Sequence, residues 1–189
     1  MKNSFLDRYQ QVIMVIATFL AGFLFLAIPV VSNANTKSID LESGSSEYLY
    51  INDGSQTGLD ITGDMTVESW IKFESLPSSG TSYAVGSKDV SQPERSFGLG
   101  VRNDSGTYKA FMYNSADGTN ASTTGQQLVT LPSLSTGTWY HMAWSYASST
   151  GSYEFYLNGE SQGSQSNLNN SMYNSSALFA VGRMENHSH

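Results

Sequence analysis

Residues 137–160 read GTWYHMAWSYASSTGSYEFYLNGE, and this stretch decides the fold. Apolar and polar side chains alternate along residues 139–147 and again along residues 152–158, as in half-buried β-strands. The segment SSTG joins the two runs, and the second run ends at Asn158-Gly159, a dipeptide typical of tight hairpin turns. The stretch therefore predicts a β-hairpin whose aromatic rings divide between a core face and an outer face.

The alternation assigns a face to each ring. The core face of the hairpin is expected to carry Tyr140, Met142, Trp144, Tyr146, Tyr153, Phe155 and Leu157. In MTVESWIKF (65–73) the same rule places Met65, Val67, Ile71 and Phe73 inside and Glu68, Trp70 and Lys72 outside. Most rings are thus predicted to fill the interior, with one or two left for a ligand.

Short alternating segments bounded by Gly, Ser and Asn run through the rest of the chain, and residues after 34 show no sustained helical periodicity. The fold class predicted is all-β, a two-sheet antiparallel jelly-roll sandwich. The expected strands are 38–41, 47–51, 65–73, 83–87, 96–101, 108–114, 127–131, 139–147, 152–158 and 177–182.

The composition excludes several classes of function. The formal net charge is −7 over 189 residues, with no strongly basic patch, so nucleic acid is not an expected partner. The chain has no Cys, which excludes disulfides, zinc–thiolate sites and thiol nucleophiles. An acidic surface serves solubility or attracts cations such as calcium.

The N-terminus predicts export. Lys2 and Arg8 precede an uncharged run, VIMVIATFLAGFLFLAIPVV (12–31), and Ser32 and Ala34 fit a signal-peptidase site. The run is also long enough to span a bilayer as a helix, so residues 1–34 are a signal peptide cleaved near Ala34 or a retained membrane anchor. Either way residues 35–189 form the domain, secreted or on the cell surface, with membrane contact only through the N-terminal segment.

Four blocks resemble the laminin-G-like, or concanavalin A-like lectin/glucanase, jelly-roll family. They are SIDLESGSSEYLYI (38–51), LDITGDMTVESWIKF (59–73), TGTWYHMAWSYASSTGSYEFYLNGE (136–160) and ALFAVGR (177–183), in the order of the family. The resemblance implies two stacked antiparallel sheets, and a module that binds glycans or proteins. It also implies a further strand after residue 183, and the sequence ends at His189 without one.

The predicted function is an exported, non-catalytic binding module for polysaccharide or glycosylated surfaces. One alternative is a structural or adhesive module that binds other envelope proteins. The other is a glycoside hydrolase on the same fold, which needs two carboxylates about 5 Å apart for a retaining mechanism. The hydrolase relatives carry Glu-x-Asp-x-x-Glu, and no such run occurs here.

A sugar site needs a ring to stack on and polar groups for the hydroxyls. The predicted ligand-binding residues are Glu68, Trp70, Lys72, Trp139 and Tyr156. His141 is expected to be structural rather than catalytic. The resemblance implies a Ca²⁺ site at Asp40 and Glu42. The alternative is that these two carboxylates are solvated and bind no ion. No other cofactor and no catalytic residue is predicted.

Overall fold

The computed structural model describes residues 37–184, and the predicted export segment, residues 1–34, lies outside them. The chain divides into two units, residues 1–40 and 41–189. The fold described below belongs to the second unit. Within residues 37–184 no helix is long and apolar enough to cross a membrane.

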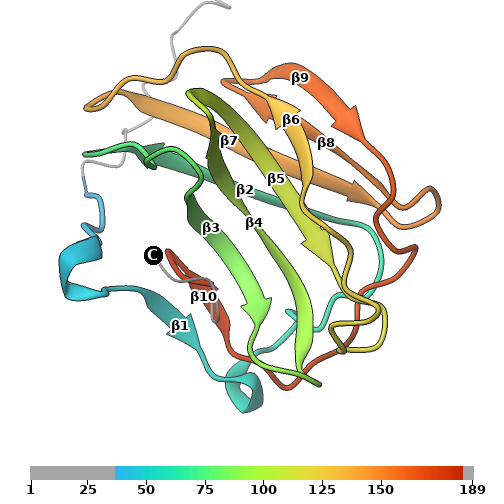
Figure 1. Cartoon of the computed structure of the whole chain (residues 1–189). Helices are drawn as coiled ribbons and strands as arrows, with labels where there is room; N and C mark the ends of the chain where they lie inside the picture. Colours follow the sequence, from blue (N-terminus) through green and yellow to red (C-terminus); the bar gives the residue numbers. More distant parts are fainter. Residues whose placement is uncertain (1–36, 185–189) are drawn as a thin grey trace, which may run out of the picture. The chain divides into compact units, whose positions relative to one another are not determined.

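Ten strands form two antiparallel sheets (Figure 1). The six-stranded sheet has the order β1-β10-β3-β4-β5-β6, and the four-stranded sheet has the order β2-β7-β8-β9. The strands are β1 Leu49–Ile51, β2 Met65–Lys72, β3 Ser82–Asp89, β4 Arg95–Asp104, β5 Thr107–Asn114, β6 Gln127–Thr130, β7 Trp139–Ala147, β8 Ser152–Leu157, β9 Glu160–Gln165 and β10 Phe179–Val181. The short 3-10 turns η1 and η2 span Ser43–Ser45 and Asp53–Ser55. The predicted fold class is confirmed.

One predicted strand is absent, and one observed strand was not predicted. Residues 38–41 form no strand, and the edge of the six-stranded sheet is β1, whose three residues are all exposed. β9 is a strand although its sequence, ESQGSQ, has no apolar residue. β9 forms because the preceding Asn158-Gly159 turn folds it back onto β8, so backbone pairing at the sheet edge replaces side-chain burial.

The Asn158-Gly159 turn has the backbone geometry typical of a two-residue β-hairpin turn. Asn158 and Gly159 have φ angles of 53° and 83°, the left-handed pair that a type I′ turn requires. β7 and β8 pair in the predicted hairpin, with Trp144 opposite Phe155. The rings of these two residues meet edge to face at 4.8 Å, the arrangement aromatic pairs prefer.

Trp144 joins the two sheets at the centre of the core. Its side chain has no exposed surface, and its indole Nε1 donates a hydrogen bond of 3.1 Å to the carbonyl oxygen of Phe111, on β5 of the facing sheet. Tyr153 on β8 likewise donates to the carbonyl of Gln127 over 2.7 Å. The large rings therefore fill the interior without leaving their polar atoms unpaired.

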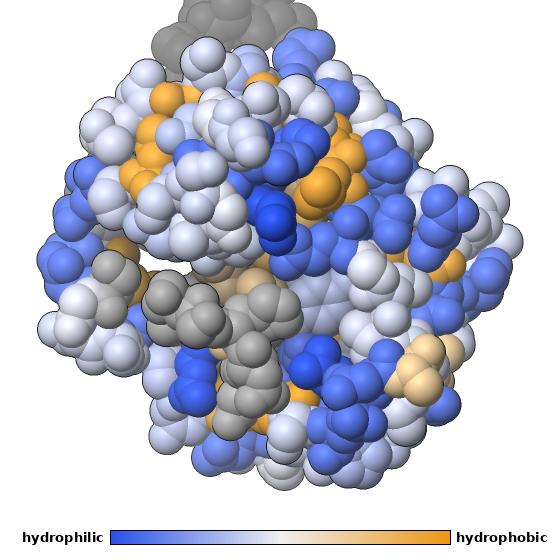
Figure 2. All heavy atoms as spheres, in the orientation of Figure 1, coloured by the Kyte–Doolittle hydropathy of each residue, from blue (hydrophilic) through white to orange (hydrophobic). Residues whose placement is uncertain are grey.

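The residues that form the core are those that the alternation of apolar and polar residues predicted to face inward. The cluster between the sheets contains all the hairpin positions predicted to face inward, together with β4 and β5 side chains such as Leu99, Val101 and Met112. The surface seen in Figure 2 is mostly hydrophilic, with apolar side chains in small separate groups. This is the surface expected when large apolar side chains fill a sandwich core.

A buried lysine ties the β1–β2 connection to the sheet. Lys88 on β3 is 2% exposed, and its Nζ contacts Asp60 Oδ1 at 2.5 Å, Gln56 Oε1 at 2.9 Å and Asp53 Oδ1 at 3.2 Å. Its three N–H groups thus have three acceptors, which a buried ammonium requires. Gln56 in turn donates to the carbonyl of Ala177 over 3.1 Å.

We predict that Trp144→Ala lowers the free energy of unfolding by about 3–5 kcal/mol, because it removes a fully buried ring and leaves a cavity. Trp139→Ala is the control, since that ring is 45% exposed and sits on the outer face of the same strand. Urea denaturation of the full chain measures both. Equal losses for the two variants would contradict the packing described for Trp144.

We predict that Lys88→Met lowers the free energy of unfolding by roughly 1–3 kcal/mol. Breaking a buried ion pair costs about 3–5 kcal/mol, and the partial exposure of Asp53 and Asp60 lets water take over part of the lost interaction. Lys109→Met is the matched control, because Lys109 pairs with Asp104 over 2.7 Å nearer the surface. The control should cost less than about 1 kcal/mol, and a control loss as large as that of Lys88→Met would contradict the prediction.

Candidate functional site

The outer face of the four-stranded sheet gathers the residues predicted to bind a ligand. Glu68, Trp70 and Lys72 alternate outward on β2, Trp139 and His141 on β7, and Tyr156 on β8. We call these six residues the platform. Strand register brings them together: Trp70 lies opposite His141, and Lys72 lies opposite Trp139.

The two tryptophans are the large exposed apolar side chains of the platform. Trp70 is 66% exposed and Trp139 is 45% exposed, which confirms the prediction that Trp70 is an exposed ring. By register they are diagonal neighbours on paired strands, a spacing within reach of large aromatic side chains. Such rings cost hydrophobic free energy when they face water and recover it when a ligand covers them.

Each tryptophan has a polar neighbour that holds it. The ring of Trp70 lies 5.3 Å from the imidazole of His141 at an interplanar angle of 47°. His141 Nε2 is 3.5 Å from Glu68 Oε2, a contact that becomes an ion pair when the imidazole is protonated. Sequence reasoning gave His141 a structural role but did not show that it lies beside Trp70.

Lys72 extends over the ring of Trp139, with 5.6 Å from its Nζ to the ring centroid. A cation at this distance is attracted by the negative face of the ring. The contact orients both side chains on the outer face, so the ring and the ammonium are presented together.

Tyr156 stands at the other side of the platform. Ala143, a small residue, separates Tyr156 from Glu68 in the strand register. A hydrogen bond to Glu154 raises the pKa of the Tyr156 hydroxyl above its ordinary value. Hydrogen bonds from Ser161 and from Tyr156 lower the pKa of the Glu154 carboxyl, so Glu154 stays ionised and fixes the phenol.

The acids of the predicted calcium site belong to different units. Asp40 is the last residue of the first unit, and Glu42 lies in the second. In the second unit Glu42 and Glu74, both exposed, bring carboxylate oxygens within 4.8 Å of each other. Ca²⁺ takes six to eight oxygens, so these two carboxylates fit in type and fall short in number. Calcium binding stays a prediction.

The chain is similar to known proteins in sequence pattern and in fold. The family described as the concanavalin A-like lectin/glucanases superfamily matches residues 43–189. Among solved structures, the native heptameric SAP-like pentraxin from Limulus polyphemus is similar, with a TM-score of 0.51 and 16% sequence identity. The alignment covers 68% of this chain and 57% of the pentraxin chain, and at this identity it shows a shared fold alone. None of the curated proteins matches the chain.

We predict that Ser161→Ala raises the pKa of the Glu154 carboxyl toward its ordinary value, because the Ser161 hydroxyl is the main group that lowers it. Ser161 Oγ donates to Glu154 Oε1 over 2.6 Å. Ser164→Ala is the control: Ser164 lies opposite Glu154 on β9. An NMR titration of the Glu154 side-chain carbon measures the pKa. An unchanged pKa in Ser161→Ala, or equal shifts in both variants, would contradict the assignment.

Proposed function

Because the chain belongs to the concanavalin A-like lectin/glucanases superfamily, we propose that its jelly roll is a non-catalytic carbohydrate-binding module and that the platform is its binding face. The exposed Trp70 is the observation that carries this proposal. Its ring is 66% exposed on a strand whose apolar residues Met65, Val67 and Ile71 pack in or against the core. The outward direction is therefore fixed by the fold, and the ring is held there by His141.

The platform offers the groups that a sugar needs. The faces of Trp70 and Trp139 can stack on the apolar face of a pyranose ring, and aromatic stacking adds about 0.5–1.5 kcal/mol beyond the buried area. Lys72 donates to hydroxyl oxygens and Glu68 accepts from hydroxyl groups. These groups lie on β2 and β7, and Tyr156 extends the platform onto β8, which suits a polysaccharide or a glycosylated surface lying across the sheet.

A second candidate function is adhesion to a neighbouring protein. The edge strand β1 favours it, because Leu49, Tyr50 and Ile51 are 41%, 54% and 43% exposed and, within residues 37–184, β1 pairs only with β10. Edge strands with apolar side chains can add a strand from another chain. Export to the cell surface, which both candidates require, is proposed from residues 1–34 alone.

Titration of the full chain with a panel of soluble polysaccharides tests the platform. We expect Trp70→Ala to weaken binding by roughly 0.5–1.5 kcal/mol beyond the lost buried area. Its melting temperature should not change, because a 66% exposed ring contributes little to the core. Tyr50→Ala is the matched control, since it removes an exposed ring from the other sheet.

Three outcomes would contradict the proposal: no binding across the panel, equal affinity of wild type and Trp70→Ala for a bound glycan, or a loss confined to Tyr50→Ala. The last outcome would favour the β1 edge and adhesion. Release of reducing sugar by the wild type would replace the non-catalytic proposal with glycoside hydrolysis.

A further inference from the structure

A pocket lies away from the platform, beside the start of β4 and the end of β5 in the six-stranded sheet. It has a volume of about 190 Å³ and is lined by Arg95, Tyr113 and residues 123–126. Ligand pockets for drug-sized molecules span about 300–1,000 Å³, so this one has room for a single small ring. The platform residues take no part in it, because they belong to the other sheet.

Tyr113 forms one wall of the pocket, and a glycine on the neighbouring strand leaves room for its ring. The ring lies over Gly98 of β4, where a Cβ would come within 2.6 Å of the ring carbons. Any side chain at position 98 would therefore push the ring away. The Tyr113 hydroxyl donates a hydrogen bond to Asp89, and burial, aided by the charge of Asp89, raises the Tyr113 pKa far above its usual value.

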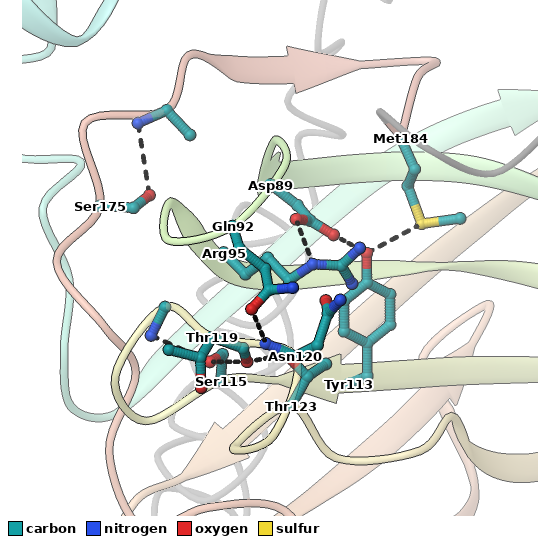
Figure 3. Close-up of polar contacts among 12 residues, drawn as sticks. Asp89, Gln92, Arg95, Tyr113, Ser115, Thr119, Asn120, Thr123, Ser175 and Met184 are labelled. Atoms are coloured by element: carbon teal, nitrogen blue, oxygen red, sulfur yellow. Dashed lines mark hydrogen bonds and ion pairs between the residues drawn. The ribbon is translucent and has the colours of Figure 1, made fainter.

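Arg95 supplies the charge of the pocket. Its side chain is 15% exposed, and its Nε lies 3.8 Å from Asp89 Oδ1. That Nε is buried and donates no hydrogen bond to any residue in the described part of the chain. Figure 3 shows the guanidinium of Arg95 beside the hydroxyl of Tyr113, with Asp89 on the same side. A guanidinium carries five N–H donors in one plane, so Arg95 retains donors for a ligand.

The remaining wall is a loop held in place by β5. Thr124 N donates to the carbonyl of Asn114 over 2.8 Å, and Asn114 N donates to Thr124 Oγ1 over 3.0 Å. Gln126 Oε1 accepts from Arg102 over 3.2 Å, which leaves the Gln126 NH₂ group as a donor. The pocket is thus preorganised, with Arg95 and the Gln126 amide as donors for a ligand, whereas the Thr123 hydroxyl donates to the carbonyl of Thr119 over 2.7 Å and can accept a hydrogen bond.

We propose that this pocket binds an acidic monosaccharide unit, with the sugar carboxylate on the Arg95 guanidinium and its hydroxyls toward Gln126 and Thr123. A guanidinium recognises a carboxylate through paired N–H···O bonds. Asp89 behind Arg95 leaves no excess positive charge, so a singly charged carboxylate is favoured over a doubly charged phosphate. This pocket is separate from the proposed platform and would let the module bind a negatively charged sugar unit of a glycan.

Calorimetric titration of the full chain with D-glucuronate tests the proposal, with D-glucose and acetate as comparison ligands. We expect glucuronate to bind at least about tenfold more tightly than either, because only glucuronate has both the carboxylate and the ring hydroxyls. Arg95→Gln should lower the affinity for glucuronate about tenfold or more. Lys109→Gln, which removes a cation from β5 outside the pocket, should leave it unchanged.

Gly125→Leu adds a bulky side chain to a residue that lines the pocket. No atom lies within 4 Å of the position a Cβ would take at Gly125, so the new side chain has space at its base. We expect this variant to melt like the wild type and to lose glucuronate binding.

Several results would overturn the proposal: no binding of glucuronate, equal binding of glucose or acetate, or wild-type affinity in Gly125→Leu. Trp70→Ala must keep its affinity for glucuronate. A loss there would place the acidic sugar on the platform instead of the pocket, whereas failure of the platform alone would leave the Arg95 site intact.

Discussion

The sandwich depends on the contact of Trp144 with the facing sheet. The ring comes from the middle of β7 and reaches the carbonyl of Phe111 on β5, so one residue fixes the two sheets both by packing and by a directed hydrogen bond. Because side chains alternate along a strand, fixing Trp144 inward also fixes His141 and Trp139, which lie on the opposite side of β7. The outward direction of the platform is a consequence of how the core is filled.

Both proposed ligand sites use a short rigid element to hold a ring. On the four-stranded sheet, Trp70 stands on β2 and leans on the imidazole of a paired strand. On the six-stranded sheet, Tyr113 lies flat where Gly98 removes the competing side chain. The two sites differ in burial: the platform carries Lys72 and an exposed Glu68 on an open sheet face, whereas the pocket places Arg95 and its partner Asp89 in a mostly buried setting. On these two proposals, the platform would bind neutral sugar units of a glycan, and the pocket on the other sheet would bind acidic ones.

The alternation of apolar and polar residues predicted the features of the fold that depend on local sequence. The alternation in residues 65–73 and 139–158 predicted the core faces and the exposed Trp70, because burial of one sheet face follows from period-two spacing. β9 was missed because its polar residues form a strand only through pairing with β8. Lys88 was missed because its partners lie in the β1–β2 connection, whose course no periodicity describes. Arg95 was missed because its partner, Asp89, comes from the paired strand β3, and the alternation within one strand does not show which residues of two strands lie opposite each other. The strand predicted at residues 38–41 is wrong, because that segment has no partner strand in the described structure.

The pairing of β1 with β10 has a consequence for how the chain folds. Leu49 lies opposite Val181, so the first and last strands of the sheet meet only after nearly the whole domain has been arranged between them. Closing so long a loop is entropically costly, and each strand contributes just three residues to the contact. The hairpins of β4 with β5 and β7 with β8 need only short loops. This edge therefore forms last and opens first, and its amide protons exchange with solvent well before those of the Trp144 core.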